Sequence, residues 1–145
     1  MSTLTVSKHF VEASLSGAQR LGLDVHELLQ EAGISPDLLR IEKARVSSDQ
    51  FSKLMQVIWQ RTGDEFMGMG PRRARSGTFA TMCALVVGCQ TLEEVYQQAL
   101  RFSRLFEPMV SMELEIFGDR ARLVTRIEGS NHDPDYFMRE SIVVI

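Results

Sequence analysis

The sequence predicts an α+β fold, in which a mostly helical domain packs on an antiparallel β-hairpin or small sheet. Apolar residues recur with a period of about 3.6 residues along much of the chain up to Phe106, and from Val110 the period changes to about 2 residues. The length of 145 residues and the hydrophobic share of 44% suit one globular domain with a buried core.

The first two helices are expected near the N-terminus. One spans about Ser7 to Leu21, with an apolar stripe made of Phe10, Ala13, Gly17 and Leu21. The next begins at Asp24, where Asp24 and Glu27 have the spacing of a capping box, and it ends at Gly33.

A third and a fourth helix follow. Pro36 opens the third, which runs to about Ile41, because the missing N–H of proline is harmless in a first turn. Ser47 and Gln50 are expected to cap the fourth helix, which ends at Gly63. Its apolar stripe consists of Phe51, Leu54, Met55, Ile58 and Thr62.

Two further helices are expected after a break at Gly68, Gly70 and Pro71. The segment from Thr78 to Cys89 is apolar on nearly every face, so we expect it to be buried on nearly every side. Thr91 and Glu94 then form a capping box for a helix from Leu92 to Phe106, which Pro108 stops. That helix is expected to bury Leu92, Val95, Tyr96, Ala99, Phe102 and Phe106.

A β-hairpin is expected next. Apolar and polar residues alternate from Val110 to Ile116, and Gly118-Asp119 is a two-residue turn of the type that places glycine first. If Phe117 pairs with Arg120, then Glu115 lies opposite Arg122 on the outer face. A lone hairpin is marginally stable, so we expect further strands or helices on its apolar face. On the second strand that face carries Ala121, Leu123, Thr125 and Ile127.

The C-terminal part is expected to hold a turn from Asn131 to Pro134 and a last helix. The sequence stops within an apolar run, Ile142 to Ile145, that lacks a glycine, proline or polar cap. We therefore expect the chain, residues 1–145, to be a fragment of a longer protein.

Composition excludes several classes of function. The net charge of −3 and the pI of about 5.6 argue against nucleic-acid binding by this chain alone. No apolar run has the ~20 residues of a membrane span, and no signal peptide is visible, so no membrane partner is expected. Cys83 and Cys89 point to different faces of one helix and suit a reducing cytoplasm.

The segment from Val25 to Arg40 looks like a helix-turn-helix but is interpreted as a structural helix pair. Its second helix carries Pro36, Asp37 and Leu38 where a DNA reader needs Arg, Lys, Asn or Gln. The acidic side chains of this part of the chain would repel phosphates, and they belong to Asp24, Glu27, Glu31, Asp37 and Glu42.

The remaining chemistry-bearing residues indicate neither a metal site nor an enzyme. His9, His26 and His132 lie far apart and lack spaced partner ligands, so no metal and no cofactor are expected. Neither cysteine has a histidine or helix start placed to activate it. A haem site stays open as an alternative only through His9, which stands beside Phe10.

The order and spacing of the motifs resemble a known family. The stretch RSGTFATMCALVVGCQTLEEVYQQALRFSRLF, Arg75 to Phe106, has the pattern G-[ST]-F-x-x-[LM], an apolar run, then x-T-L-x-E-[AV]. This pattern is similar to that of the non-cupin, "arabinose-binding" sensor domain of AraC-type transcription regulators. Further resemblance lies in Gly22 to Ile34, in Arg45-Val46-Ser47 and in Thr62-Gly63-Asp64, so it covers the chain from about Val6 onward.

The resemblance implies an effector-sensing and dimerisation domain of a cytoplasmic regulator. It implies a small-molecule effector, a homodimer, and contact with DNA only through a downstream domain that residues 1–145 do not include. Two alternatives stay open. One is a ligand-free protein-interaction and dimerisation module, and the other is a haem-type gas sensor of similar layout.

A ligand pocket is predicted between the apolar helix and the hairpin. Its expected lining is Phe79, Met82, Cys83, Phe102 and Met112, because flexible methionine suits an adaptable apolar cavity. Arg75 is the candidate for a ligand carboxylate, since a guanidinium pairs bidentately with carboxylates. The alternative is that the apolar set is core and that Arg72, Arg73 and Arg75 form a solvated charge run.

Overall fold

The computed structural model describes residues 4–70, 72–105, 110–127, 137 and 140. In these residues five α-helices, one 3₁₀ helix and two antiparallel strand pairs form a mostly helical α+β structure, which confirms the predicted fold class. The elements are β1 (Thr5–Ser7), α1 (Lys8–Arg20), α2 (Val25–Glu31), η1 (Pro36–Arg40), β2 (Arg45–Ser47), α3 (Ser48–Thr62), α4 (Thr78–Val86), α5 (Leu92–Ser103), β3 (Val110–Phe117) and β4 (Arg120–Ile127).

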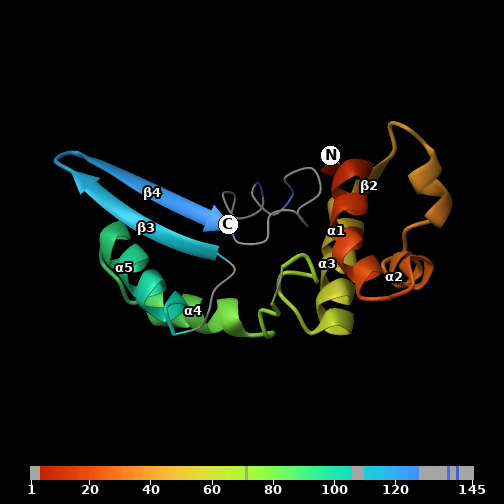
Figure 1. Cartoon of the computed structure of the whole chain (residues 1–145). Coiled ribbons are helices and arrows are strands. Elements are labelled where there is room, and N and C mark those ends of the chain that lie inside the picture. Colours follow the sequence, from red (N-terminus) through yellow and green to blue (C-terminus); the bar gives the residue numbers. More distant parts are fainter. Residues whose placement is uncertain (1–3, 71, 106–109, 128–136, 138–139, 141–145) are drawn as a thin grey trace.

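The elements form two groups (Figure 1). Residues 4–62, from β1 to α3, are called the N-terminal region here, and residues 78–127, from α4 to β4, the C-terminal region. Residues 63–77 link the two groups and are called the connecting segment. Helices α4 and α5 lie along one side of the β3–β4 hairpin, while α1 and α3 stand together at the other end of the molecule (Figure 1).

The N-terminal region encloses the hydrophobic core. Helix α3 packs against α1 and α2, and the buried side chains come mainly from these three helices. The core residues are Val11, Ala13, Leu15, Ala18, Leu28, Leu29, Ala32, Ile34, Val46, Leu54, Val57, Ile58, Met67, Met69 and Phe137. The predicted stripe of α1 is right for Ala13 and Gly17 but wrong for Leu21, which is 43% exposed because α1 ends at Arg20.

The capping signals read from the sequence determine where helices begin and end. The Asp24 carboxylate accepts the backbone N–H groups of His26 at 2.7 Å and Glu27 at 3.3 Å. Ser47 and Gln50 form the predicted reciprocal capping box at the start of α3. Gly63 ends α3 in the left-handed conformation, at φ +61°.

The predicted structural role of the helix pair formed by α2 and η1 agrees with its packing. Leu28 and Leu29 are buried, α2 packs against α3, and η1 packs on α1. Glu31 on α2 and Arg61 on α3 form an ion pair that raises the pKa of Arg61, through a side-chain hydrogen bond first and charge attraction second. Helices α2 and η1 are therefore packed into the N-terminal region as structural elements.

One strand pair was not predicted. Strand β1 pairs antiparallel with β2, with Thr5 opposite Ser47 and Ser7 opposite Arg45. The Arg45 guanidinium donates to the Thr5 hydroxyl at 2.6 Å and to the Thr5 carbonyl at 2.7 Å. Strands of three residues are too short to show an alternating pattern.

The hairpin forms as predicted. Glu115 lies opposite Arg122 and Phe117 opposite Arg120, and Gly118 takes φ +58° in the turn. The outer face carries ion pairs of Arg122 with Glu115 and of Arg126 with Glu113, the second at 2.8 Å. The expected cover on the hairpin is helix α5, which packs against β3.

Helices α4 and α5 pack against each other, and both are shorter than predicted. Helix α4 ends at Val86 rather than Cys89, and α5 ends at Ser103. Thr91 accepts from the backbone N–H of Glu94 at 3.2 Å, and the Glu94 carboxylate accepts from that of Gln90 at 2.7 Å. Both partners of the predicted capping box thus bind a backbone N–H group.

Some predictions fall outside the described residues: Phe106, Pro108, His132, the turn from Asn131 to Pro134 and most of the last helix. Of the residues predicted to form that helix, Phe137 and Glu140 are described and are helical. Phe137 is buried, and its ring centroid lies 6.1 Å from that of Phe10 on α1.

Candidate functional site

The connecting segment is organised by a buried carboxylate. Asp64 is only 1% exposed, and its side chain accepts three backbone N–H groups. The donors are Phe66 at 3.0 Å, Gly68 at 2.9 Å and Ala74 at 2.8 Å. These bonds draw the two ends of the turn at residues 66–74 together, and the backbone of Asp64 pairs with that of Arg75 in an isolated bridge. The Asp64 side chain therefore fixes the turn of the connecting segment.

The next residue, Glu65, fixes the start of α4. Its carboxylate accepts the backbone N–H groups of Gly77 at 2.7 Å and Phe79 at 2.9 Å. Gly77 is the N-cap of α4 and has no side chain with which to cap the helix. Glu65 satisfies these otherwise unpaired groups and places a negative charge at the positive end of the helix dipole. The position of Phe79 is thereby set from the connecting segment.

The residues predicted to bind a ligand lie on three adjoining elements. Phe79, Met82 and Cys83 are on α4, Phe102 is on α5, and Met112 is on β3, while α5 packs against both α4 and β3. Phe79 and Cys83 are exposed, and the other three are half-buried. Met112 also packs against the hydrophobic core, so it joins the hairpin to the core.

The prediction that α4 is buried on nearly every side is wrong. No residue of this helix is buried in the described structure, and Phe79 is 45% and Leu85 55% exposed. Leu92, the first residue of α5, was predicted to be buried but is 74% exposed. An apolar sequence favours removal from water, but it does not specify whether the same chain or another molecule covers the surface.

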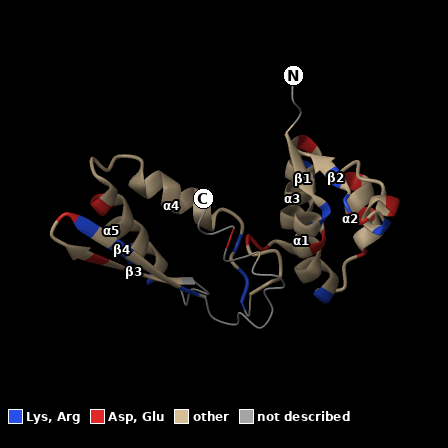
Figure 2. Ribbon diagram, turned by 90° about the horizontal axis from the view of Figure 1, so that it is seen from above, with Lys and Arg blue, Asp and Glu red and all other residues tan. Residues whose placement is uncertain are grey.

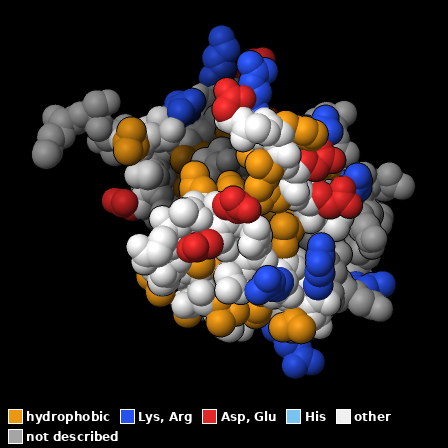
Figure 3. Space-filling model, turned by 90° about the vertical axis from the view of Figure 1, so that its left-hand side faces the viewer, with side chains coloured by type: hydrophobic (Ala, Val, Ile, Leu, Met, Phe, Trp, Pro, Cys, Tyr) orange, Lys and Arg blue, Asp and Glu red, His pale blue; other side chains and the backbone are white. Residues whose placement is uncertain are grey.

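Many large apolar side chains of the C-terminal region and its turns are exposed. Figure 3 shows hydrophobic side chains around a hollow on the side that carries α5 and the hairpin. The large hydrophobic residues of the C-terminal region and its turns with substantial exposure are Phe79, Leu85, Val87, Leu92, Leu105, Ile116, Phe117 and Leu123. Large apolar side chains left exposed in this way are typical of a binding or association surface. Phe117 lies on the outer face of the hairpin with Arg122, opposite to Ile116 and Leu123. We call the set without Phe117 the apolar face.

Arg75 lies at the edge of α4. Its side chain is exposed, and its carbonyl accepts the backbone N–H of Thr78 at 3.1 Å and the Thr78 hydroxyl at 2.7 Å. The backbone of Arg75 is thus held at the first turn of α4.

A separate cleft of about 310 Å³ lies where the connecting segment meets the end of α1. It is lined by Arg20, Leu21, Asp64, Gly68, Gly70, Arg72 and Arg73. None of the six predicted ligand residues lines it. Arg72 and Arg73 were noted in the sequence as a charge run, but Arg20 and Asp64 were not connected with them. The one local signal was the glycine-rich break beside the arginine pair.

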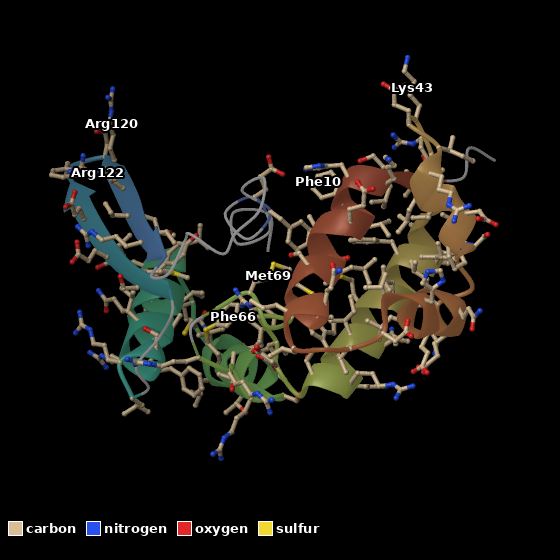
Figure 4. The ribbon with its side chains drawn as sticks, turned by 45° about the vertical axis from the view of Figure 1, so that its right-hand side comes forward. Phe10, Lys43, Phe66, Met69, Arg120 and Arg122 are labelled. Carbon is tan, nitrogen blue, oxygen red and sulfur yellow. The ribbon has the colours of Figure 1, made fainter. Side chains whose placement is uncertain are left out.

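Side chains from α1 and from the connecting segment contribute to the apolar core. Figure 4 shows Phe10, Phe66 and Met69 in the central part, whereas Arg120 and Arg122 lie at the tip of the hairpin and Lys43 at the opposite end. Phe10 and Phe66 pack against the core, to which Met69 belongs. Phe66 and Met69 come from the connecting segment, so that segment is anchored in the core.

The described histidines and cysteines do not gather into a site. His9 and His26 are exposed, and Cys83 and Cys89 are free thiols. In the described part of the chain, no group of three His, Cys, Asp or Glu residues is placed to hold a metal ion. The ring of His9 lies 5.5 Å from that of Phe10, edge to face. Among the same residues, no helix has the length and apolar character needed to cross a membrane.

Comparison with known proteins gives one match. The family described as "Arabinose-binding domain of AraC transcription regulator, N-term" matches residues 22–145. The match includes the connecting segment, α4, α5 and the hairpin, and it begins after α1. No curated protein and no solved structure matches the chain.

Proposed function

Because the chain belongs to the family of N-terminal arabinose-binding domains of AraC transcription regulators, we propose that it binds its effector on the surface formed by α4, α5 and β3. Domains of this family are regulatory and not enzymatic, and an effector-binding domain implies a small-molecule effector. The chemistry of the face supports a small, largely apolar molecule, with or without a carboxylate. The proposed contacts are Phe79, Met82, Cys83, Phe102, Met112 and Arg75.

The observation that carries this proposal is the exposure of α4. An apolar helix with no buried residue leaves surface in contact with water that a ligand can cover, at about 25 cal/mol for each Å² removed. Glu65 holds the start of this helix, and α5 packs against it. The apolar side chains of α4 are therefore held in place before a ligand binds. Arg75 adds a cation at the first turn, where a carboxylate would pair with it.

Homodimerisation is proposed as a second role of the same region. Val87 is 85% and Leu92 74% exposed, and both lie between the end of α4 and the start of α5. Two copies that cover these residues would remove more apolar surface than a small ligand does. In this proposal the regulator acts in the cytoplasm and reaches DNA through a domain downstream of residue 145.

A thermal-shift screen of fatty, aromatic and amino acids tests the effector site. A ligand at 100 times its Kd stabilises the folded state by about 2.7 kcal/mol, which raises the Tm by several degrees. Met82→Trp and Phe79→Trp should abolish the shift by filling the site. Ile41→Trp is the matched control, because Ile41 is also an exposed apolar residue (60%) but lies in the N-terminal region.

Circular dichroism should show that each variant is folded. A hit that survives both Met82→Trp and Phe79→Trp in folded protein would place the effector elsewhere. A hit that Ile41→Trp also removes would show that the substitutions act through stability and not through the site.

A further inference from the structure

We propose that the cleft between the end of α1 and the connecting segment binds a small organic dianion, such as a phosphate monoester or a dicarboxylate. Its lining holds three guanidinium groups, from Arg20, Arg72 and Arg73, and a single carboxylate, that of Asp64. Arg20 is far in sequence from Arg72 and Arg73, and the fold brings the three to one cleft. Figure 2 shows basic and acidic positions side by side in the segment that joins α3 to α4.

The carboxylate in the lining is already engaged. Asp64 is 1% exposed and accepts the backbone N–H groups of Phe66, Gly68 and Ala74. The Asp64 carboxylate therefore binds the backbone of the connecting segment. Arg20 and Arg73 form no ion pair with any residue in the described part of the chain. The guanidinium charges of Arg20 and Arg73 outnumber the one carboxylate of the lining, so the cleft retains positive charge that a ligand can balance.

The two walls of the cleft are held in close contact by glycines. A Cβ atom added at Gly17 of α1 would lie 2.1 Å from the Met67 carbonyl oxygen. A Cβ atom at Gly68 would lie 2.7 Å from the Leu21 side chain and 2.8 Å from the Gly17 carbonyl oxygen. Only glycine permits this approach of backbone to backbone, so the wall that carries Arg20 and the wall that carries Arg72 and Arg73 are seated against each other. A site whose walls are already fixed in place loses little conformational freedom when a ligand binds.

The ligand class follows from the charge and size of the cleft. A planar guanidinium pairs bidentately with carboxylate or phosphate oxygens, and several of them favour a dianion over a monoanion. A volume of about 310 Å³ accommodates a small metabolite only. The chain as a whole has a net charge of −3, so its long-range field repels anions. Binding must therefore come from the local arginines and should weaken with added salt.

This cleft is distinct from the proposed effector site. None of its lining residues belongs to the apolar face or to the proposed effector contacts. The two proposals can therefore fail separately. A dianion that binds in the presence of Met82→Trp would be bound in the cleft and not at α4.

Isothermal titration calorimetry of the chain at ~50 mM salt tests the inference, because screening is weak at that ionic strength. The probes are inorganic phosphate, glycerol phosphate, succinate and, as the monoanion, acetate. We expect at least one dianion to bind about tenfold or more tightly than acetate, since additional charge-assisted pairs form. Preference for the phosphates or for succinate then identifies the source of the dianion.

Arg20→Gln and Arg73→Gln should each weaken the binding of that dianion about tenfold or more, since each removes a charge-assisted contact. Arg101→Gln is the matched control, because Arg101 is an exposed arginine of α5 far from the cleft lining. All three side chains are exposed, so the variants should fold, which circular dichroism checks. Equal affinity for acetate, the absence of any dianion binding, or binding that both cleft variants leave unchanged would overturn the inference.

Discussion

The N-terminal and C-terminal regions use their apolar residues in different ways. In the N-terminal region the apolar side chains of three helices close on one another, and Leu29, Leu54 and Ile58 are fully buried. In the C-terminal region no residue of α4 or α5 is buried, and the apolar side chains of both helices and of the hairpin face outward in part. Stability is therefore concentrated in one region and available binding surface in the other. The same amino-acid types serve both, and only packing distinguishes them.

The largest effect that can test this contrast is the truncation of a leucine in each region. Leu54→Ala, at a side chain that is 0% exposed, should lower the free energy of unfolding by about 2–5 kcal/mol because it leaves a cavity. Leu85→Ala, at a side chain that is 55% exposed, should change it by about 0.5 kcal/mol or less. Urea denaturation monitored by circular dichroism gives both values.

Measuring the effect of Leu85→Ala at two protein concentrations tests whether a second copy covers this surface. If a second copy covers the apolar face, the effect of Leu85→Ala should grow between ~1 μM and ~100 μM protein, because association stabilises the folded state by mass action. A large effect of Leu85→Ala that is independent of concentration would contradict the contrast, since it would mean that α4 is buried within one chain.

A second prediction concerns two aspartates that both accept backbone N–H groups. Asp64→Asn should lower the free energy of unfolding by about 2–3 kcal/mol, because an amide nitrogen would face a buried donor and the charge would be lost. Asp24→Asn should change it by about 0.5 kcal/mol or less, because asparagine is an equally good N-cap residue and this site is exposed. Equal effects in chemical denaturation would show that the connecting segment is not held by Asp64.

The smallest effect is expected at the surface of the hairpin. Glu115→Gln removes the charge that pairs with Arg122, and such a cross-strand pair contributes roughly 0.2–1 kcal/mol. Raising the salt concentration should shrink the difference between wild type and variant, since exposed charges are screened. A double-mutant cycle with Arg122→Gln measures it, and a coupling that does not respond to salt would speak against a charge effect.

The features that sequence analysis predicted well depend on residues a few positions apart. The caps at Asp24, Ser47 and Thr91 and the register of the hairpin at Gly118 all follow from local chemistry. The three-residue pair of β1 and β2 was not predicted, because its partners lie far apart and each strand is too short to show a period.

The candidate sites were less accessible to sequence analysis. The apolar run from Thr78 was recognised, but composition could not indicate that α4 would pack on α5 and still leave Phe79 and Leu85 exposed. The cleft could not be predicted, because Arg20 and Arg73 line one cleft only when Gly17 lets the connecting segment approach α1. Close approach of two backbones depends on the whole fold, and in the sequence it is marked only by isolated glycines.

The adjacent carboxylates of Asp64 and Glu65 have a consequence for the rate at which amide protons exchange with solvent. Together they hold the N–H groups of Phe66, Gly68, Ala74, Gly77 and Phe79. Most of these amides lie outside the regular helices and strands, where exchange is usually fast, yet both carboxylates protect them. Deuterium uptake at these positions therefore records the opening of the link between the two regions, separately from the slower exchange of the core helices.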